Sequence, residues 1–205
     1  MNQPPVFTHG MLDVLRELMN IGVGRAARAI AEMSGREVVL RVLDIELLDL
    51  AGTRQLRDLR GQINLRVSQT FRGGLEGCAL FALNRTGAVR LAQLLLGKAD
   101  EDVAFDELDQ GALLELGNIV IGSAVGMLAS ELAVEVRYEL PQLQLRGIKE
   151  AADLFADVAQ GDQTHALVMR ASLTLREDVV NGYLFLFFPG PGLRALINRL
   201  SRLAP

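Results

Sequence analysis

Two short motifs place a carboxylate and a carboxamide three residues apart in helix-like surroundings. Glu17 and Asn20 form the first pair, and Glu115 and Asn118 form the second. Residues three or four apart on a helix share a face, so each pair would present its two polar groups together. A carboxamide donates and accepts hydrogen bonds without bringing charge toward an anionic group, whereas a carboxylate can pair with a cation. These four residues are therefore the first candidates for chemistry.

A solvated helix face is the alternative interpretation, because a gene duplication would copy an idle Glu and Asn as faithfully as a working pair. The pair occurs twice in register, and an Asn inside a helix costs roughly 0.5 kcal/mol relative to Ala. Nearby glycines add up to ~1 kcal/mol each. They could admit either the backbone of a docking protein or a core contact between helices, and the sequence leaves both open. These glycines are Gly22, Gly24, Gly117 and Gly122.

The chain repeats itself at an offset of 98 residues (118 − 20). When residues 15–26 are aligned with residues 113–124, seven of the twelve positions are identical. Asn and Gly are among the matches and are poor helix formers, so shared helix composition does not explain them. We therefore predict one domain, residues 1–205, built of two repeats at 8–98 and 106–203, with the joint near residues 97–105.

The periodicity of apolar residues predicts similar elements in each half. Each half has about three strands with one face to cover, so two halves can share a core about a pseudo-twofold axis. Short links between the later strands favour antiparallel pairs. The expected fold class is α/β, with helices packed on a mainly antiparallel sheet. We expect helices at 8–33, 86–96, 106–132, 148–158 and 193–203, and strands at 37–42, 63–71, 77–83, 134–140, 166–175 and 182–188.

Composition narrows the class of protein. Of 205 residues, 50% are hydrophobic and 22% are charged, which is typical of a folded soluble chain. The formal net charge of −4 argues against a protein built mainly to hold nucleic acid. No signal peptide is visible at residues 1–8, and no apolar run approaches the ~20 residues of a membrane span. We expect a cytoplasmic protein without a membrane partner.

The sequence lacks the residues that metal sites, catalytic triads and dinucleotide-binding sites require. His9 and His165 are the two histidines and stand at non-equivalent places, so metal clusters and His-based triads are not expected. Cys78 is the single cysteine and is expected to be a buried small hydrophobe. Residues 22–24 give half of a dinucleotide fingerprint, but within a predicted helix rather than after a strand. We expect no cofactor bound by the chain itself.

The first helix resembles the CheC/CheX/FliY family of chemotaxis phosphatases. The family signature reads Asp/Ser-x3-Glu-x2-Asn-Ile-x2-Gly, with a proline 23 positions after the Asn. Asp13, Glu17 and Asn20 match it here, whereas Leu43 stands at the proline position. This departure concerns the local strand geometry of the first site.

The second helix departs from the signature in a complementary way. Glu115, Asn118 and Pro141 match, whereas Gly111 stands at the Asp/Ser position, so a supporting contact is missing there. Two such motifs in one chain make the arrangement most similar to CheC, and the resemblance spans about residues 8–203.

The resemblance implies a substrate, the phosphorylated receiver domain of a CheY-like response regulator, whose aspartyl phosphate would be hydrolysed. Asn20 and Asn118 would orient the attacking water, and Glu17 and Glu115 would each pair with a receiver lysine. A general-base role for either Glu is a weaker alternative. The Mg²⁺ of the reaction would belong to the receiver.

Two other functions fit the sequence. The chain could be a docking module that binds a phosphorylated receiver, a flagellar-switch protein or a CheD-like deamidase without hydrolysing anything. The family resembles the middle domain of FliM, which lacks the Glu/Asn pair, so the two pairs here favour an enzyme. One working site beside one decayed site is a third possibility, given Leu43 and Gly111.

Overall fold

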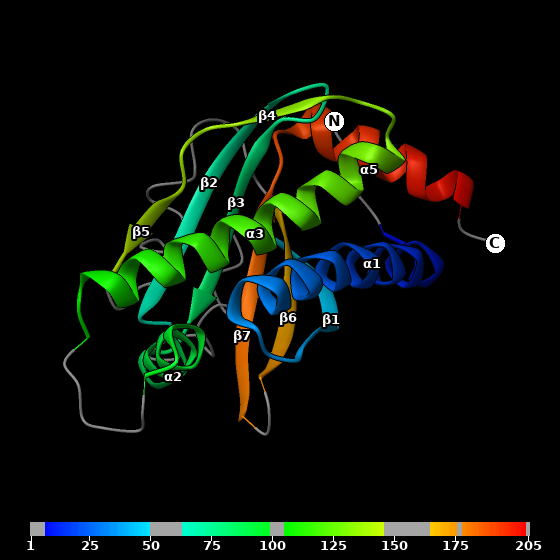
Figure 1. Ribbon diagram of the computed structural model, residues 1–205. Helices are drawn as coiled ribbons and strands as arrows, with labels where there is room; N and C mark the ends of the chain where they lie inside the picture. The colour runs from blue at the N-terminus through cyan, green and yellow to red at the C-terminus, as the bar shows by residue number, and fades with distance from the viewer. Residues whose placement is uncertain (1–6, 50–62, 99–104, 146–164, 176–177, 204–205) are drawn as a thin grey trace.

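The described part of the chain forms helices packed on one antiparallel sheet (Figure 1). The fold is therefore the mixed α/β class that the sequence predicts, with helices and sheet in layers. This computed structural model describes residues 7–49, 63–98, 105–145, 165–175 and 178–203.

Capping residues mark several helix ends. Thr8 caps the first helix by accepting from the Met11 N–H, and Gly35 ends it in the left-handed region at φ 64°. Asp106 and Asp109 form a reciprocal capping box at the start of the third. The helices are α1 (His9–Ser34), α2 (Arg85–Leu96), α3 (Glu107–Glu131) and α5 (Gly190–Leu203).

Within the described residues the sheet has seven strands in the order β1-β6-β7-β3-β2-β4, with β5 also paired to β2. Every described pair is antiparallel, as the short links in the sequence predict. The strands are β1 (Val38–Asp49), β2 (Leu65–Gly73), β3 (Gly77–Leu83), β4 (Val136–Tyr138), β5 (Gln142–Gln144), β6 (His165–Leu175) and β7 (Asp178–Phe187).

The strand order places β1, β6 and β7 on one side of the sheet and β3, β2 and β4/β5 on the other. Each long helix is followed by a strand that pairs with a strand from the other half of the sequence: β1 with β6, and β4 and β5 with β2. Strands from both halves therefore share one sheet and one core. The division into two repeats at 8–98 and 106–203 stays a prediction.

The core lies between the sheet and the two long helices. Figure 1 shows α1 and α3 running side by side across one face of the sheet, with α2 near one end of this layer and α5 near the other. Leu15, Met19, Leu116 and Val120 are buried in this layer. The polar motif residues of α1 and α3 therefore occupy the helix faces that the core leaves free.

Close packing explains two of the four glycines. A methyl group on Gly22 would lie 3.0 Å from the Ser123 carbonyl oxygen and 3.1 Å from the Met127 Cβ, so Gly22 allows α1 to approach α3. A methyl group on Gly117 would lie 2.6 Å from the Val67 Cβ, so Gly117 seats α3 on β2. The core-contact interpretation holds for these two glycines.

Several expected boundaries differ from the structure. β1 extends to Asp49, beyond the expected 37–42, because it continues past a bulge and keeps pairing with β6. The strand expected at 134–140 is shorter, and a separate strand, β5, follows it after Pro141. Strand β3 has the expected bounds, 77–83. The helix expected at 148–158 lies outside the described residues.

Two apolar features of the sequence are buried. Cys78 lies in a cluster on the sheet face opposite α1 and α3, where burial raises the pKa of its thiol to about 11. Helix α3 is long and apolar enough by composition to cross a membrane, the one such helix among the described residues. Its apolar side chains pack on α1, β2 and β3, as expected for the core helix of a globular domain.

Candidate functional site

Asn20 joins helix α1 to a bulge in strand β1. Its Oδ1 accepts a hydrogen bond of 2.9 Å from the Val42 backbone N–H, and its Nδ2 donates one of 3.0 Å to the Arg16 carbonyl. Both partners have a single role, since a backbone N–H only donates and a carbonyl only accepts. The orientation of the Asn20 carboxamide is therefore fixed.

The bulge explains how Leu43 occupies the position of the signature proline. Val42 is opposite Ala171 and Asp44 is opposite Arg170, so Leu43 is the extra residue on its strand. Leu43 is 53% exposed, and its φ is not in the positive range that favours glycine. The bulge is present with Leu43 in place of proline, and the Asn20 Oδ1 accepts the Val42 N–H beside it. The departure from the signature at Leu43 therefore does not remove the bulge.

Asn118 on α3 is held by a side chain rather than by the backbone. The Gln69 Nε2 of strand β2 donates to the Asn118 Oδ1 at 3.0 Å and to the Glu139 carbonyl at 3.0 Å. Gln69 is 4% exposed, and the Glu139 backbone N–H donates to the Thr70 carbonyl at 2.9 Å. Asn118 is thus linked through Gln69 to the segment between β4 and β5.

Pro141 lies in this segment and is half-buried. Tyr138 is opposite Phe71 and Gln142 is opposite Ser68, so three residues on one strand face two on β2. The strand therefore carries one extra residue here, as β1 does at Leu43. A proline has no N–H to contribute to the ladder, which is consistent with a break in strand pairing at this point.

The two motif glutamates are exposed and unpaired within the described part of the chain. Glu17 and Glu115 make no hydrogen bond or ion pair there, so both carboxylates are available to a partner. Asp13, the supporting residue of the first motif, instead pairs with Arg16 at 2.8 Å. Gly111 takes its place in the second motif and has nothing within 4 Å of an added Cβ. The second site therefore lacks this local ion pair.

The structure thus brings each Asn next to the bulge that follows its helix, and leaves each Glu on the outside. A model of the CheC-like family matches residues 11–42. The CheY-P phosphatase CheC of Bacillus subtilis (strain 168) is 28% identical over 186 residues, which span 82% of this chain and 88% of that protein.

The chain is similar to the CheC-like family at its first motif and to CheC of Bacillus subtilis over most of its length. The structure of FliY from Thermotoga maritima has a TM-score of 0.75 at 20% identity, covering 97% of this chain and 99% of that chain. A chain from the FliM–SpeE complex of H. pylori has a TM-score of 0.66 at 12% identity, covering 96% and 97%. These two likenesses show the fold alone.

The CheC-like match includes the whole first site. Residues 11–42 contain Asp13, Glu17 and Asn20 and end at Val42, whose N–H binds Asn20. The second site, Glu115 and Asn118, lies outside the matched range but within the described fold. Its likeness to the first site is therefore supported by the repeat in sequence and by the bulge next to each Asn.

Open space remains over the other two glycines. Gly24 and Gly122 each follow an Asn by four residues, and an added Cβ on either would meet none of the described residues within 4 Å. The Tyr138 hydroxyl donates to the Gly122 carbonyl at 3.2 Å, which leaves the Cα side of Gly122 open. For these two positions the core-contact explanation does not hold, and the approach of a partner stays a prediction.

Exposed apolar side chains accompany both motifs. Ile21 follows Asn20 directly and is 45% exposed, and Leu43 projects from the bulge that Asn20 holds. Leu140, next to the Gln69-bound carbonyl of Glu139, is 87% exposed. Polar groups flanked by exposed apolar residues are typical of a protein-binding surface.

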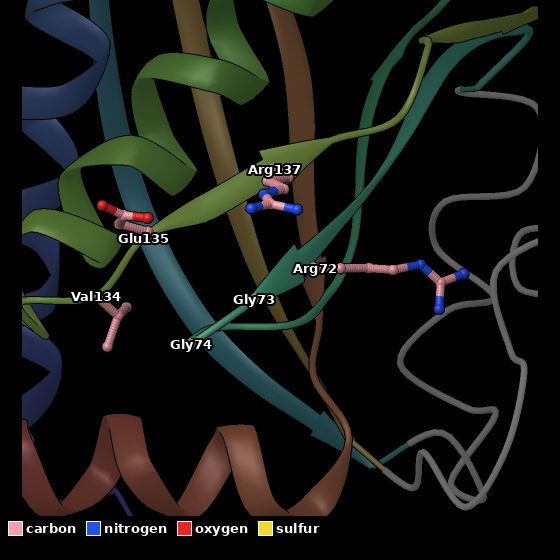
Figure 2. Close-up of a pocket in the computed structure, with 6 residues that line it drawn as sticks. All are labelled: Arg72, Gly73, Gly74, Val134, Glu135 and Arg137. Atoms are coloured by element: carbon pink, nitrogen blue, oxygen red, sulfur yellow. The ribbon is translucent and has the colours of Figure 1, made fainter.

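A hollow of about 430 Å³ lies elsewhere, where the β2–β3 turn meets the start of β4 (Figure 2). Arg72 and Arg137 are opposite each other in register, but Figure 2 shows the Arg72 side chain pointing away from Arg137. Arg72 pairs with Glu139 at 2.8 Å, which raises the pKa of its guanidinium. The hollow contains no motif residue, and its two cations do not converge on one ligand.

Sequence reasoning missed Gln69 and the role of Val42. The sequence offers one signal for Gln69: it is a polar residue at an inward position of a strand whose other inward residues are apolar. A buried polar side chain needs a hydrogen-bond partner, so such a position indicates a specific contact. No group of three or more His, Cys, Asp or Glu side chains that could hold a metal is found across the described residues.

Proposed function

We propose that this CheC-like protein hydrolyses the aspartyl phosphate of a CheY-like receiver domain, using Glu17 with Asn20 and Glu115 with Asn118. One observation carries the proposal: in both motifs the carboxamide oxygen is bound inward by an N–H donor, while the neighbouring glutamate is exposed and unpaired among the described residues. The CheY-P phosphatase CheC of Bacillus subtilis, similar over most of the chain, supports the choice of substrate.

The inward bond gives each carboxamide a defined outward direction. With Oδ1 bound by the protein, Nδ2 can hold a water molecule through an N–H; at Asn20 this is the N–H that the Arg16 carbonyl does not accept. A water held in line with the phosphorus–oxygen bond attacks the phosphoryl group, releasing inorganic phosphate and the receiver aspartate. Positioning of the nucleophile is most of what a protein must supply in phosphoryl transfer.

The glutamates would set the register of the complex. An exposed carboxylate one turn before the Asn can pair with a lysine of the receiver and place the Asn over the phosphoryl group. A lysine is the expected partner because an exposed carboxylate pairs with a cation and the resemblance to the CheC family implies a receiver lysine. The Mg²⁺ belongs to the substrate, and the proposal needs no cofactor bound by this chain.

A docking module without catalysis is the second candidate. The same fold occurs in a chain of the FliM–SpeE complex, and a fold alone does not determine activity. Asn20 also satisfies the Val42 N–H, a structural role that could preserve an Asn without chemistry. A CheD-like deamidase and flagellar-switch proteins remain proposed partners of such a module, with a cytoplasmic location in either case.

Lifetimes of the phosphorylated receiver separate the two functions. A CheY-like receiver from the same organism would be charged with acetyl phosphate and followed with and without the protein. The phosphatase proposal requires faster loss of phosphate at catalytic amounts of the protein. Binding to the phosphorylated receiver with an unchanged phosphate lifetime would replace the enzyme by the docking module.

A further inference from the structure

Gln69 connects the second motif to the rest of the sheet. It lies in strand β2, faces α3, and is 4% exposed. Its Nε2 donates to the Asn118 Oδ1 and to the Glu139 carbonyl, each at 3.0 Å. Among the described residues of the first site no side chain plays this part: the Val42 N–H binds Asn20 directly, and Ala171 stands opposite Val42.

The hydrogen bonds determine the orientation of both amides. The Glu139 carbonyl only accepts, so the Gln69 group facing it must be Nε2. The Asn118 atom that receives the other Nε2 hydrogen must then be Oδ1. Glu139 is itself held by the Thr70 carbonyl through its backbone N–H and by Arg72 through its side chain. The orientation of Asn118 therefore depends on a fixed backbone carbonyl through one intermediate side chain.

This arrangement leaves one atom unsatisfied. The Gln69 Oε1 is buried and has no hydrogen-bond partner in the described part of the chain. A buried acceptor without a partner destabilises the fold, and an apolar side chain of similar length would avoid this cost. The fold alone does not require Gln at this position, since the first half forms its bulge with alanine opposite.

We propose that Gln69 is a positioning residue for Asn118: it holds Oδ1 inward, so that Nδ2 faces the water at the second site. The inference rests on the proposed phosphatase activity. It assigns the two sites different supports, a backbone N–H at the first and a buried side chain at the second. Activity at the second site then depends on Gln69, whereas activity at the first does not.

Two substitutions separate positioning from packing. Gln69→Met keeps the length and removes both the donor and the unsatisfied acceptor. Gln69→Glu keeps the shape but presents only acceptors, which favours a reversed Asn118 carboxamide. Ser68→Ala is the matched control, because Ser68 is the neighbouring residue on β2 and points to the opposite face of the sheet.

Each variant would be made in an Asn20→Asp background, so that the second site carries the activity. We expect Gln69→Met to lower kcat for receiver dephosphorylation about tenfold with little change in KM, and Gln69→Glu to lower it further. The melting temperature of Gln69→Met should change little, because removal of the unsatisfied Oε1 offsets the loss of the donor to the Glu139 carbonyl and the Asn118 Oδ1. Unchanged kcat in both variants, in a background that is active, would overturn the inference.

An NMR measurement tests the same inference without activity. The side-chain amide signals of Asn118, assigned by their loss in Asn118→Ala, should shift in both Gln69 variants and stay in place in Ser68→Ala. Asn118 signals that do not move would overturn the positioning role. If the wild type shows no phosphatase activity, the proposed function fails, and the NMR result still decides whether Gln69 orients Asn118.

Discussion

Gly117 and Gly122 lie on the same helix, and the structure gives them opposite responses to one added methyl group. Helix α3 loses roughly 0.5–1 kcal/mol at each glycine relative to alanine. At Gly122 an alanine Cβ meets nothing within 4 Å, so Gly122→Ala should recover that energy. At Gly117 the Cβ would lie 2.6 Å from the Val67 Cβ.

The cost at Gly117 follows from that distance. Carbon atoms pack best at about 3.5–4.0 Å, so the contact is roughly 1 Å too short. Val67 is fully buried and β-branched, so it cannot rotate away, and α3 must move off the sheet. Overpacking of this kind costs about 1–3 kcal/mol, and the upper end applies here. After the gain in helix propensity, Gly117→Ala should destabilise the fold by about 2 kcal/mol.

Thermal unfolding followed by circular dichroism measures both effects. For a chain of this size, 1 kcal/mol shifts the melting temperature by roughly 2–4 °C. Gly117→Ala should therefore melt about 4–8 °C below the wild type, and Gly122→Ala about 1–4 °C above it. Two shifts of the same sign would refute the assignment of Gly117 to the core and Gly122 to the open face.

Two further predictions concern Asn20 and the start of α3. Asn20→Ala should destabilise the fold by about 1–3 kcal/mol in denaturant titrations, because the Val42 N–H loses its acceptor. Asn20→Asp keeps an acceptor and should destabilise the fold less. Equal losses of stability in the two variants would argue against a role of Asn20 as the acceptor for Val42. Hydrogen bonds from the Asp109 N–H and then from Lys98 lower the pKa of Asp106 below its usual 3.8. A carboxyl with a lowered pKa stabilises the fold above pH 3.8 and loses this effect as the pH falls through its folded pKa. The difference in melting temperature between wild type and Asp106→Asn should therefore shrink as the pH falls below 3.8. A difference that stays constant with pH would contradict this effect of Asp106.

The sequence predicts the helices and the placement of the motifs well, because both depend on local patterns. Helix α1 begins after its cap Thr8 and α3 after its cap Asp106, and the spacing of apolar residues predicts both starts to within one residue. The outward position of Glu17 and Glu115 follows from helical periodicity. These features need no knowledge of which strands meet.

The partners of the two asparagines depend on register, which a single sequence does not specify. The bulge at Leu43 becomes visible when β1 is paired with β6, a strand from the other half of the chain. In the sequence Gln69 is one of several polar residues in β2. Its contact with Asn118 can be predicted only when the pairing of β4 and β5 with β2 is known. The effect of Leu43 at the proline position also depends on this pairing, and the structure has the bulge there without a proline.

The most direct test of the central claim compares four proteins in one assay. Wild type, Asn20→Ala, Asn118→Ala and the double variant would be incubated with an acetyl-phosphate-charged CheY-like receiver, and loss of phosphate would be followed. Folding of each variant would be checked by its melting temperature. We expect wild type to shorten the phosphate lifetime, each single variant to retain the contribution of its intact site, and the folded double variant to have no effect. A folded double variant that dephosphorylates the receiver as fast as wild type would contradict the claim that these carboxamides perform the chemistry.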